Sequence, residues 1–225
     1  MAIGIMNAEE IIERLKQTSD PKYLEGMKRF AVDNSKALGI SLPNLRKVAK
    51  GIKKDHQLAL DLWATGIHEC RVLASLVDDP KLVTPEQMDN WAADFYSWDV
   101  CDQVCGNLFD RTPYAIEKAL EYSQSDKEYI KRAGFVLMAE FAVHDKTASD
   151  EAFMPFFPII EREAWDDRNF VKKAVNWALR QIGKRNKNLC KASTECAKRI
   201  AQQDSKAARW IAKDALAEFE KKFGD

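Results

Sequence analysis

The chain has 225 residues, of which 46% are hydrophobic and 31% charged; this composition excludes a disordered chain and supplies a sizeable core without disulfides or structural metals. Its 35 basic residues balance its 35 acidic residues, so the total charge alone indicates no polyanionic partner. No apolar run approaches the roughly 20 residues that a membrane-spanning helix needs, and residues 1–12 lack the features of a secretory signal, so we expect a cytoplasmic protein with no membrane contact.

Amphipathic helical segments follow one another along the chain, and the alternation typical of strands is nearly absent. The first expected helix carries Ile11 and Leu15 on one side. A capping residue closely followed by proline, which starts a helix, occurs at Asp20-Pro21, Ser41-Leu-Pro43, Thr84-Pro85 and Thr112-Pro113. Asp126 opens a long segment, and further helices are expected at about 150–163, 168–184, 188–202 and 204–222.

Roughly a dozen helices joined by short loops form antiparallel neighbours. Over 200 residues, this pattern favours an all-α fold in which helix pairs stack into a curved superhelix, or solenoid, with a concave groove. We expect one domain covering residues 1–225, with a repeat of about 35–45 residues. A compact helical bundle is the alternative architecture.

Five cysteines occur without the spacing of a zinc site, namely Cys70, Cys101, Cys105, Cys190 and Cys196. We interpret them as reduced thiols, mostly buried, because free cysteine behaves as a small hydrophobic residue. The three histidines are scattered. The sequence therefore predicts no metal site.

The basic residues are unevenly distributed, although the total charge is zero. Residues 168–213 contain 13 lysines or arginines and two acids. A second basic stretch, residues 34–54, contains six basic residues, Arg46 and Lys47 among them, and no acid. These two segments could form one positive face for a nucleic acid. Solvated helix faces explain the same charges equally well.

Trp98 and Asp102, in the segment Ser97–Gln103, are the first candidates for chemistry. Ser97 or Asp99 could cap a helix there, and a helical start would place Trp98 and Asp102 on one face. An aromatic ring beside a carboxylate suits a sugar that acquires positive charge, because both groups stabilise a cation. The alternative is a core tryptophan beside a capping aspartate.

Two further basic candidates interrupt apolar runs. Arg132 must pair with an acid, extend to solvent or bind an anion. Lys173, Trp177, Arg180 and Lys184 form a helical stripe, which is typical of a surface that contacts phosphate and sugar. A tryptophan packed between helices and flanked by solvated lysines is the alternative.

Four sequence blocks carry a family resemblance: Leu38–Pro43, Ser97–Asp102, Ile130–Ala133 and Val171–Arg180. Their order and spacing, over nearly the whole chain, resemble those of the AlkD-like DNA alkylation repair glycosylases. The resemblance implies a superhelix of HEAT-like helix pairs that binds duplex DNA containing alkylated bases. It also implies excision of cationic alkylpurines, such as N7-alkylguanine and N3-alkyladenine, by hydrolysis of the N-glycosidic bond.

By position, the resemblance makes Trp98 and Asp102 the catalytic aromatic–carboxylate pair and Arg132 the active-site arginine. Trp177 becomes the second aromatic of the cleft, and Arg180 a contact to the DNA backbone. We also predict DNA contacts from Lys173, Lys184, Arg46 and Lys47, which lie in the basic segments. An open groove, a monomer and no cofactor are expected.

Two other functions remain open: a DNA-binding relative that excises nothing, and a helical-repeat scaffold that binds proteins. Base excision requires that Trp98, Asp102 and Arg132 converge in one cationic groove. We interpret the nearby Glu69 and Arg71 as a brace between helices.

Overall fold

The computed structural model describes residues 6–224, and the predicted domain limits and the first residues considered for a secretory signal lie outside that range. Within it, every regular element is helical, with thirteen α-helices, three 3₁₀ helices and no strand. The prediction of an all-α fold is confirmed. The chain divides into two compact units, residues 1–112 and 113–225, which are described separately.

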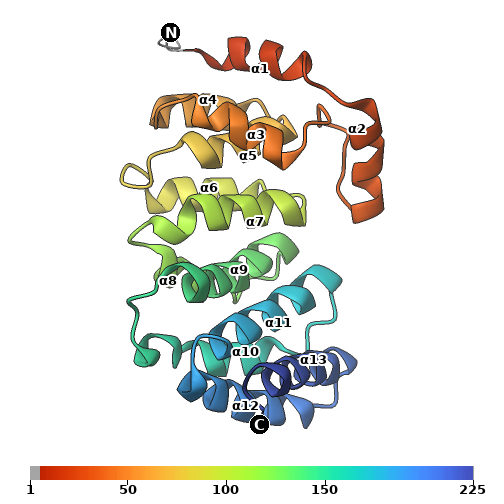
Figure 1. Cartoon of the computed structure of the whole chain (residues 1–225), viewed down its shortest axis with the longest axis vertical. Helices are drawn as coiled ribbons and strands as arrows, with labels where there is room; N and C mark the ends of the chain where they lie inside the picture. Colours follow the sequence, from red (N-terminus) through yellow and green to blue (C-terminus); the bar gives the residue numbers. More distant parts are fainter. Residues whose placement is uncertain (1–5, 225) are drawn as a thin grey trace. The chain divides into compact units, whose positions relative to one another are not determined.

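The first unit contains seven α-helices and two 3₁₀ helices (Figure 1). In chain order they are α1 (Ala8–Lys16), α2 (Pro21–Met27), η1 (Lys28–Phe30), α3 (Leu42–Lys50), α4 (His56–Ala64), α5 (His68–Val77), α6 (Pro85–Ala93), α7 (Trp98–Asn107) and η2 (Phe109–Arg111). Helices α3, α5 and α7 lie side by side in one layer, and α4 packs on α5. Figure 1 shows α2 running across the direction of these helices.

The second unit repeats this two-layer arrangement. Its elements are α8 (Ala115–Tyr122), α9 (Glu128–His144), η3 (Asp150–Phe153), α10 (Phe156–Glu163), α11 (Asn169–Gly183), α12 (Lys187–Ala201) and α13 (Lys206–Phe223). Helices α9, α11 and α13 form one layer, and α8, α10 and α12 pack against it. Lys172 approaches Trp210 and Arg180 approaches Glu218, so α11 and α13 run parallel.

The repeat length differs between the two units. In the second unit α11 begins 41 residues after α9, and α13 begins 37 residues after α11, as predicted. In the first unit α5 begins 26 residues after α3, and α7 begins 30 residues after α5. The predicted repeat of 35–45 residues is therefore too long for the first unit, where helices of nine or ten residues shorten each pair.

Most predicted helix starts are correct. Asp20 and Thr84 accept hydrogen bonds from Lys22 N and Gln87 N, and a proline follows each. The predicted start at Thr112-Pro113 is wrong, because the Thr112 hydroxyl bonds back to the Phe109 carbonyl and α8 begins at Ala115. The long helix likewise begins at Glu128, two residues after Asp126.

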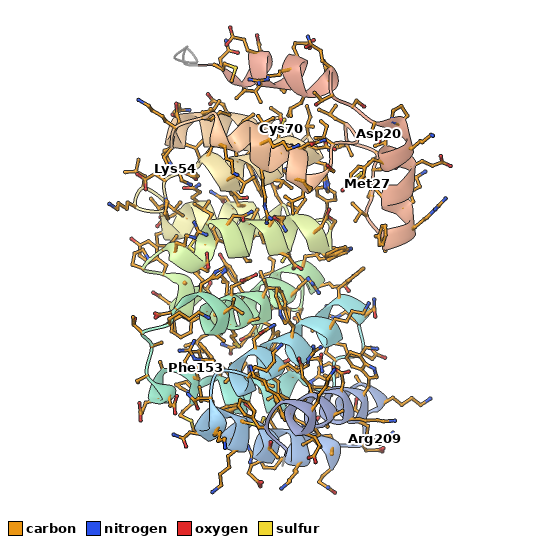
Figure 2. The ribbon with its side chains drawn as sticks, viewed as in Figure 1. Asp20, Met27, Lys54, Cys70, Phe153 and Arg209 are labelled. Carbon is orange, nitrogen blue, oxygen red and sulfur yellow. The ribbon has the colours of Figure 1, made fainter. Side chains whose placement is uncertain are left out.

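Aromatic side chains form the centre of each unit. Trp63 and Trp91 stack with ring centroids 4.0 Å apart in the first unit. In the second unit, Phe153 contacts Phe141 at 5.0 Å and Phe156 at 6.3 Å (Figure 2). All five cysteines, including Cys70 of α5, are free and buried, as predicted.

Glu69 and Arg71 are the brace that the sequence indicated. Glu69 is fully buried on α5 and accepts hydrogen bonds from the backbone N–H groups of residues 38–40. Arg71 lies over the Trp63 ring and forms an ion pair with Asp94. The α5 helix is thereby joined to the segment before α3 and to the end of α6.

Candidate functional site

Trp98 and Asp102 lie one turn apart at the start of α7. Ser97 occupies the N-cap position, Trp98 is the first helical residue, and the helix continues unbroken through Asp102. The two side chains therefore share a helix face, as predicted. Both residues are partly exposed. An aromatic ring and a carboxylate are thus adjacent and partly accessible at this end of the helix.

Asp99, between them, is engaged in a buried network. His68 of α5 places Nε2 3.0 Å from Asp99 Oδ2, and its Nδ1 is 2.8 Å from the Tyr96 hydroxyl. The Ser97 hydroxyl and Val100 N also bond to Asp99. Burial alone would raise the pKa of Asp99, but these hydrogen bonds and the His68 charge outweigh it and hold the pKa below its usual value. Asp99 is therefore a structural carboxylate.

The Trp98 indole is fixed to η1. Its Nε1 donates a hydrogen bond of 2.8 Å to the carbonyl of Phe30. No local pattern indicates this contact, which joins residues 68 positions apart. It fixes the ring position relative to Asp102 on the same helix.

A cavity of about 380 Å³ lies beside Trp98 in the first unit. Helices α2, α3, α5 and α7 contribute its walls, which include Met27 (Figure 2), Leu45 and Val72. His68, Asp99 and Gln103 add polar groups, whereas Asp102 is not part of the lining. The sequence predicts an open groove and gives no sign of this cavity.

Arg46 and Lys47 are exposed on α3. Among residues 6–224, neither has an ion-pair partner. The sequence prediction that they contact DNA is compatible with this position, because both ammonium and guanidinium groups are accessible to phosphate.

Arg132 of α9 is buried, with 6% of its surface exposed. Its Nη1 donates a hydrogen bond of 2.6 Å to the carbonyl of Phe170, and its guanidinium lies 6.0 Å from the Phe170 ring. These contacts connect α9 to the first turn of α11. Arg132 therefore has a structural contact in addition to the anion-binding role that the resemblance implies.

The predicted stripe on α11 is only partly available. Lys173 is exposed, Trp177 is partly exposed, and Lys173 has no ion-pair partner within residues 6–224. Arg180 forms ion pairs with Asp214 and Glu218 of α13, and Lys184 lies 3.0 Å from Glu218. These acids neutralise the second half of the stripe.

The structure thus places each predicted side chain on the layer formed by α3, α5 and α7 or on the layer formed by α9, α11 and α13. Trp98 and Asp102 lie together in the first unit, with Arg46 and Lys47 on α3. Arg132, Lys173, Trp177, Arg180 and Lys184 belong to the second unit. Convergence of the two sets stays a prediction. No group of three potential metal ligands occurs among the described residues.

Comparisons with known proteins point to one family. Searching the curated proteins gives no match. One solved structure covers 97% of this chain and 97% of its own, with a TM-score of 0.79 and 18% identity. It is described as representing a new family related to the HEAT-like repeat DNA glycosylases, with affinity for branched DNA structures. The likeness establishes a HEAT-like repeat fold. No described helix is long and apolar enough to cross a membrane.

The family model described as "DNA alkylation repair enzyme" matches residues 11–219, nearly the whole chain. The match includes both units and all the predicted site residues. The chain therefore belongs to the DNA alkylation repair enzyme family.

Proposed function

We propose that this protein is a DNA N-glycosylase that excises cationic alkylated purines, such as N7-alkylguanine and N3-alkyladenine, from duplex DNA. The observation that carries the proposal is the pairing of Trp98 with Asp102 on the first turns of α7, with the indole fixed by the Phe30 carbonyl. Family membership supports a role in alkylation repair.

The chemistry requires few groups. An alkylated purine already carries a positive charge, so it leaves without protonation by a general acid. The sugar then becomes an oxocarbenium ion, which the Asp102 carboxylate would stabilise while it positions the attacking water. The face of the Trp98 ring would contact the electron-poor C–H groups of the deoxyribose. Neither step calls for a metal or an organic cofactor.

DNA binding would use the accessible cations. Lys173, Arg46 and Lys47 can contact phosphates directly, and Trp177 can pack against the backbone. Arg180 and Lys184 would first exchange their carboxylate partners for phosphate. Arg132 would hold a phosphate through its guanidinium, next to the bond that it donates to Phe170.

The test is release of base from a duplex that contains N7-methylguanine. Wild-type protein should release the base, and Asp102→Asn should be slowed by about 10²-fold, because a charge-stabilising group is lost. Asp61→Asn is the matched control, since Asp61 is exposed on α4 and bonds Gln57, one turn earlier on the same helix. Equal release by wild type and Asp102→Asn would reject Asp102 as the catalytic group.

A second function is DNA binding without excision. It is favoured by the structural relative, whose description gives affinity for branched DNA rather than base release. Binding of a four-way junction, with no base released from methylated duplex at any enzyme concentration, would establish this alternative. Release that depends on Asp102 would eliminate it.

A further inference from the structure

Phe30 presents an unusually exposed aromatic ring at the end of η1. With 70% of its surface accessible, it is the most exposed of the large hydrophobic residues in the described part of the chain. A phenylalanine in water forgoes a large hydrophobic stabilisation, so a ring held outward suggests a partner for it. Part of the same residue lines the cavity beside Trp98.

The backbone around Phe30 is fixed in a costly conformation. Ala31, the next residue, has a φ of 56°, and it is the one non-glycine residue with positive φ among residues 6–224. A left-handed conformation costs a residue with a Cβ about 1–2 kcal/mol. Hydrogen bonds from Ala31 N to Lys28 O and from Trp98 Nε1 to the Phe30 carbonyl maintain it. The Phe30 ring is therefore presented by a preorganised turn.

The surrounding segment has the charge that a polyanion requires. Residues 22–50 contain seven basic residues, Lys22, Lys28, Arg29, Lys36, Arg46, Lys47 and Lys50, against the acids Glu25 and Asp33. In the described structure, none of the seven forms an ion pair. An exposed aromatic ring among unpaired cations is complementary to nucleic acid, whose bases stack and whose phosphates are negative.

We propose that Phe30 is a wedge that inserts between base pairs beside the target nucleotide. This inference rests on the duplex binding in the proposed function, but not on base excision. Apolar wedges partly unstack a base step and bend the duplex, at a cost of a few kcal/mol that the added contacts offset. Because the Phe30 carbonyl is bonded to Trp98, the distortion would occur next to the Trp98–Asp102 pair. The wedge thereby exposes the sugar on which those residues act.

The experiment uses a duplex with 2-aminopurine beside the lesion, because the fluorescence of this base rises when it is unstacked. Wild type should raise the fluorescence on binding, and Phe30→Ala should bind about tenfold more weakly without raising it. Phe30→Leu should retain most of the signal, since leucine is also an effective wedge. Leu82→Ala, which removes another exposed apolar side chain of the same unit, is the control and should behave as wild type.

The outcomes separate the two proposals. Failure of wild type to bind duplex DNA overturns both. Binding with an equal fluorescence rise for wild type and Phe30→Ala overturns the wedge alone and leaves the glycosylase intact. Binding with a wedge signal but no base release supports the wedge while rejecting the glycosylase. Thermal unfolding shows whether each variant is folded, and Phe30→Leu supplies the test if Phe30→Ala does not fold.

Discussion

Glu69 and Gly39, 30 residues apart, are joined by a hydrogen bond of 2.7 Å from the backbone N–H of Gly39 to Oε1 of Glu69. Leu38 N and Ile40 N donate to the same carboxylate, at 2.7 and 3.1 Å. Gly39 has a φ of 82°, and a Cβ there would lie 2.7 Å from the Asp20 carbonyl oxygen. The segment between α2 and α3 is therefore held in place by one buried carboxylate of α5.

Glu69→Gln should lower the free energy of unfolding by about 3 kcal/mol or more. The amide loses the negative charge and offers one oxygen in place of two, so at least one buried N–H group loses its acceptor. Urea denaturation at pH 7 measures the change. Glu13→Gln, on the exposed face of α1, is the control and should leave the midpoint unchanged. A small effect of Glu69→Gln would contradict the brace.

Glu218→Gln should strengthen DNA binding. The substitution removes the acid that pairs with Arg180 and Lys184, which makes both cations available to phosphate. Anisotropy titrations with duplex DNA should show a tighter Kd and a salt dependence steeper by about one phosphate contact. Glu195→Gln, which frees the exposed Lys198, is the matched control. Unchanged affinity would place the α11 stripe outside the DNA interface.

The same carboxylate predicts a pH dependence of stability. Burial alone would raise the pKa of Glu218, but hydrogen bonds and charges from Arg180 and Lys184 outweigh it and lower the pKa below its usual value. The folded state therefore binds this proton less readily than the unfolded state. The stability difference between wild type and Glu218→Gln should be full above the usual glutamate pKa of about 4.3 and decline as the pH falls through the lowered value. A difference that persists at the acid end would contradict this linkage.

Gly134→Ala should destabilise the second unit by about 2–3 kcal/mol. A Cβ on this residue of α9 would lie 2.8 Å from Ser123 Cα and 2.9 Å from the Ala119 carbonyl oxygen, both backbone atoms at the end of α8. Gly26→Ala is the contrasting variant, because a Cβ on this residue of α2 would meet no atom within 4 Å. It should raise stability by about 0.5–1 kcal/mol, since alanine favours a helix. Thermal or urea unfolding compares the two, and equal losses would reject close α8–α9 packing.

The local features of the fold followed from the sequence. A capping side chain and a proline act within one turn, so Asp20 and Thr84 identified their helices correctly. Thr112 carries the same signal and failed, because its hydroxyl is bonded to the turn that precedes it. Trp98 and Asp102 were correctly placed on one face, since four residues separate them on a continuous helix.

Contacts between distant residues were decided by the tertiary structure. The sequence assigned charge to the α11 stripe, yet it did not indicate that Glu218 lies against Arg180 and Lys184. Nor did it indicate that Phe30 is bonded to Trp98, 68 residues later. Helix periodicity and capping depend on neighbours along the chain, whereas these pairings depend on how successive helices stack. The amino-acid order alone determined the helices and the residue types offered to a ligand, and only packing decided which of those groups remain available.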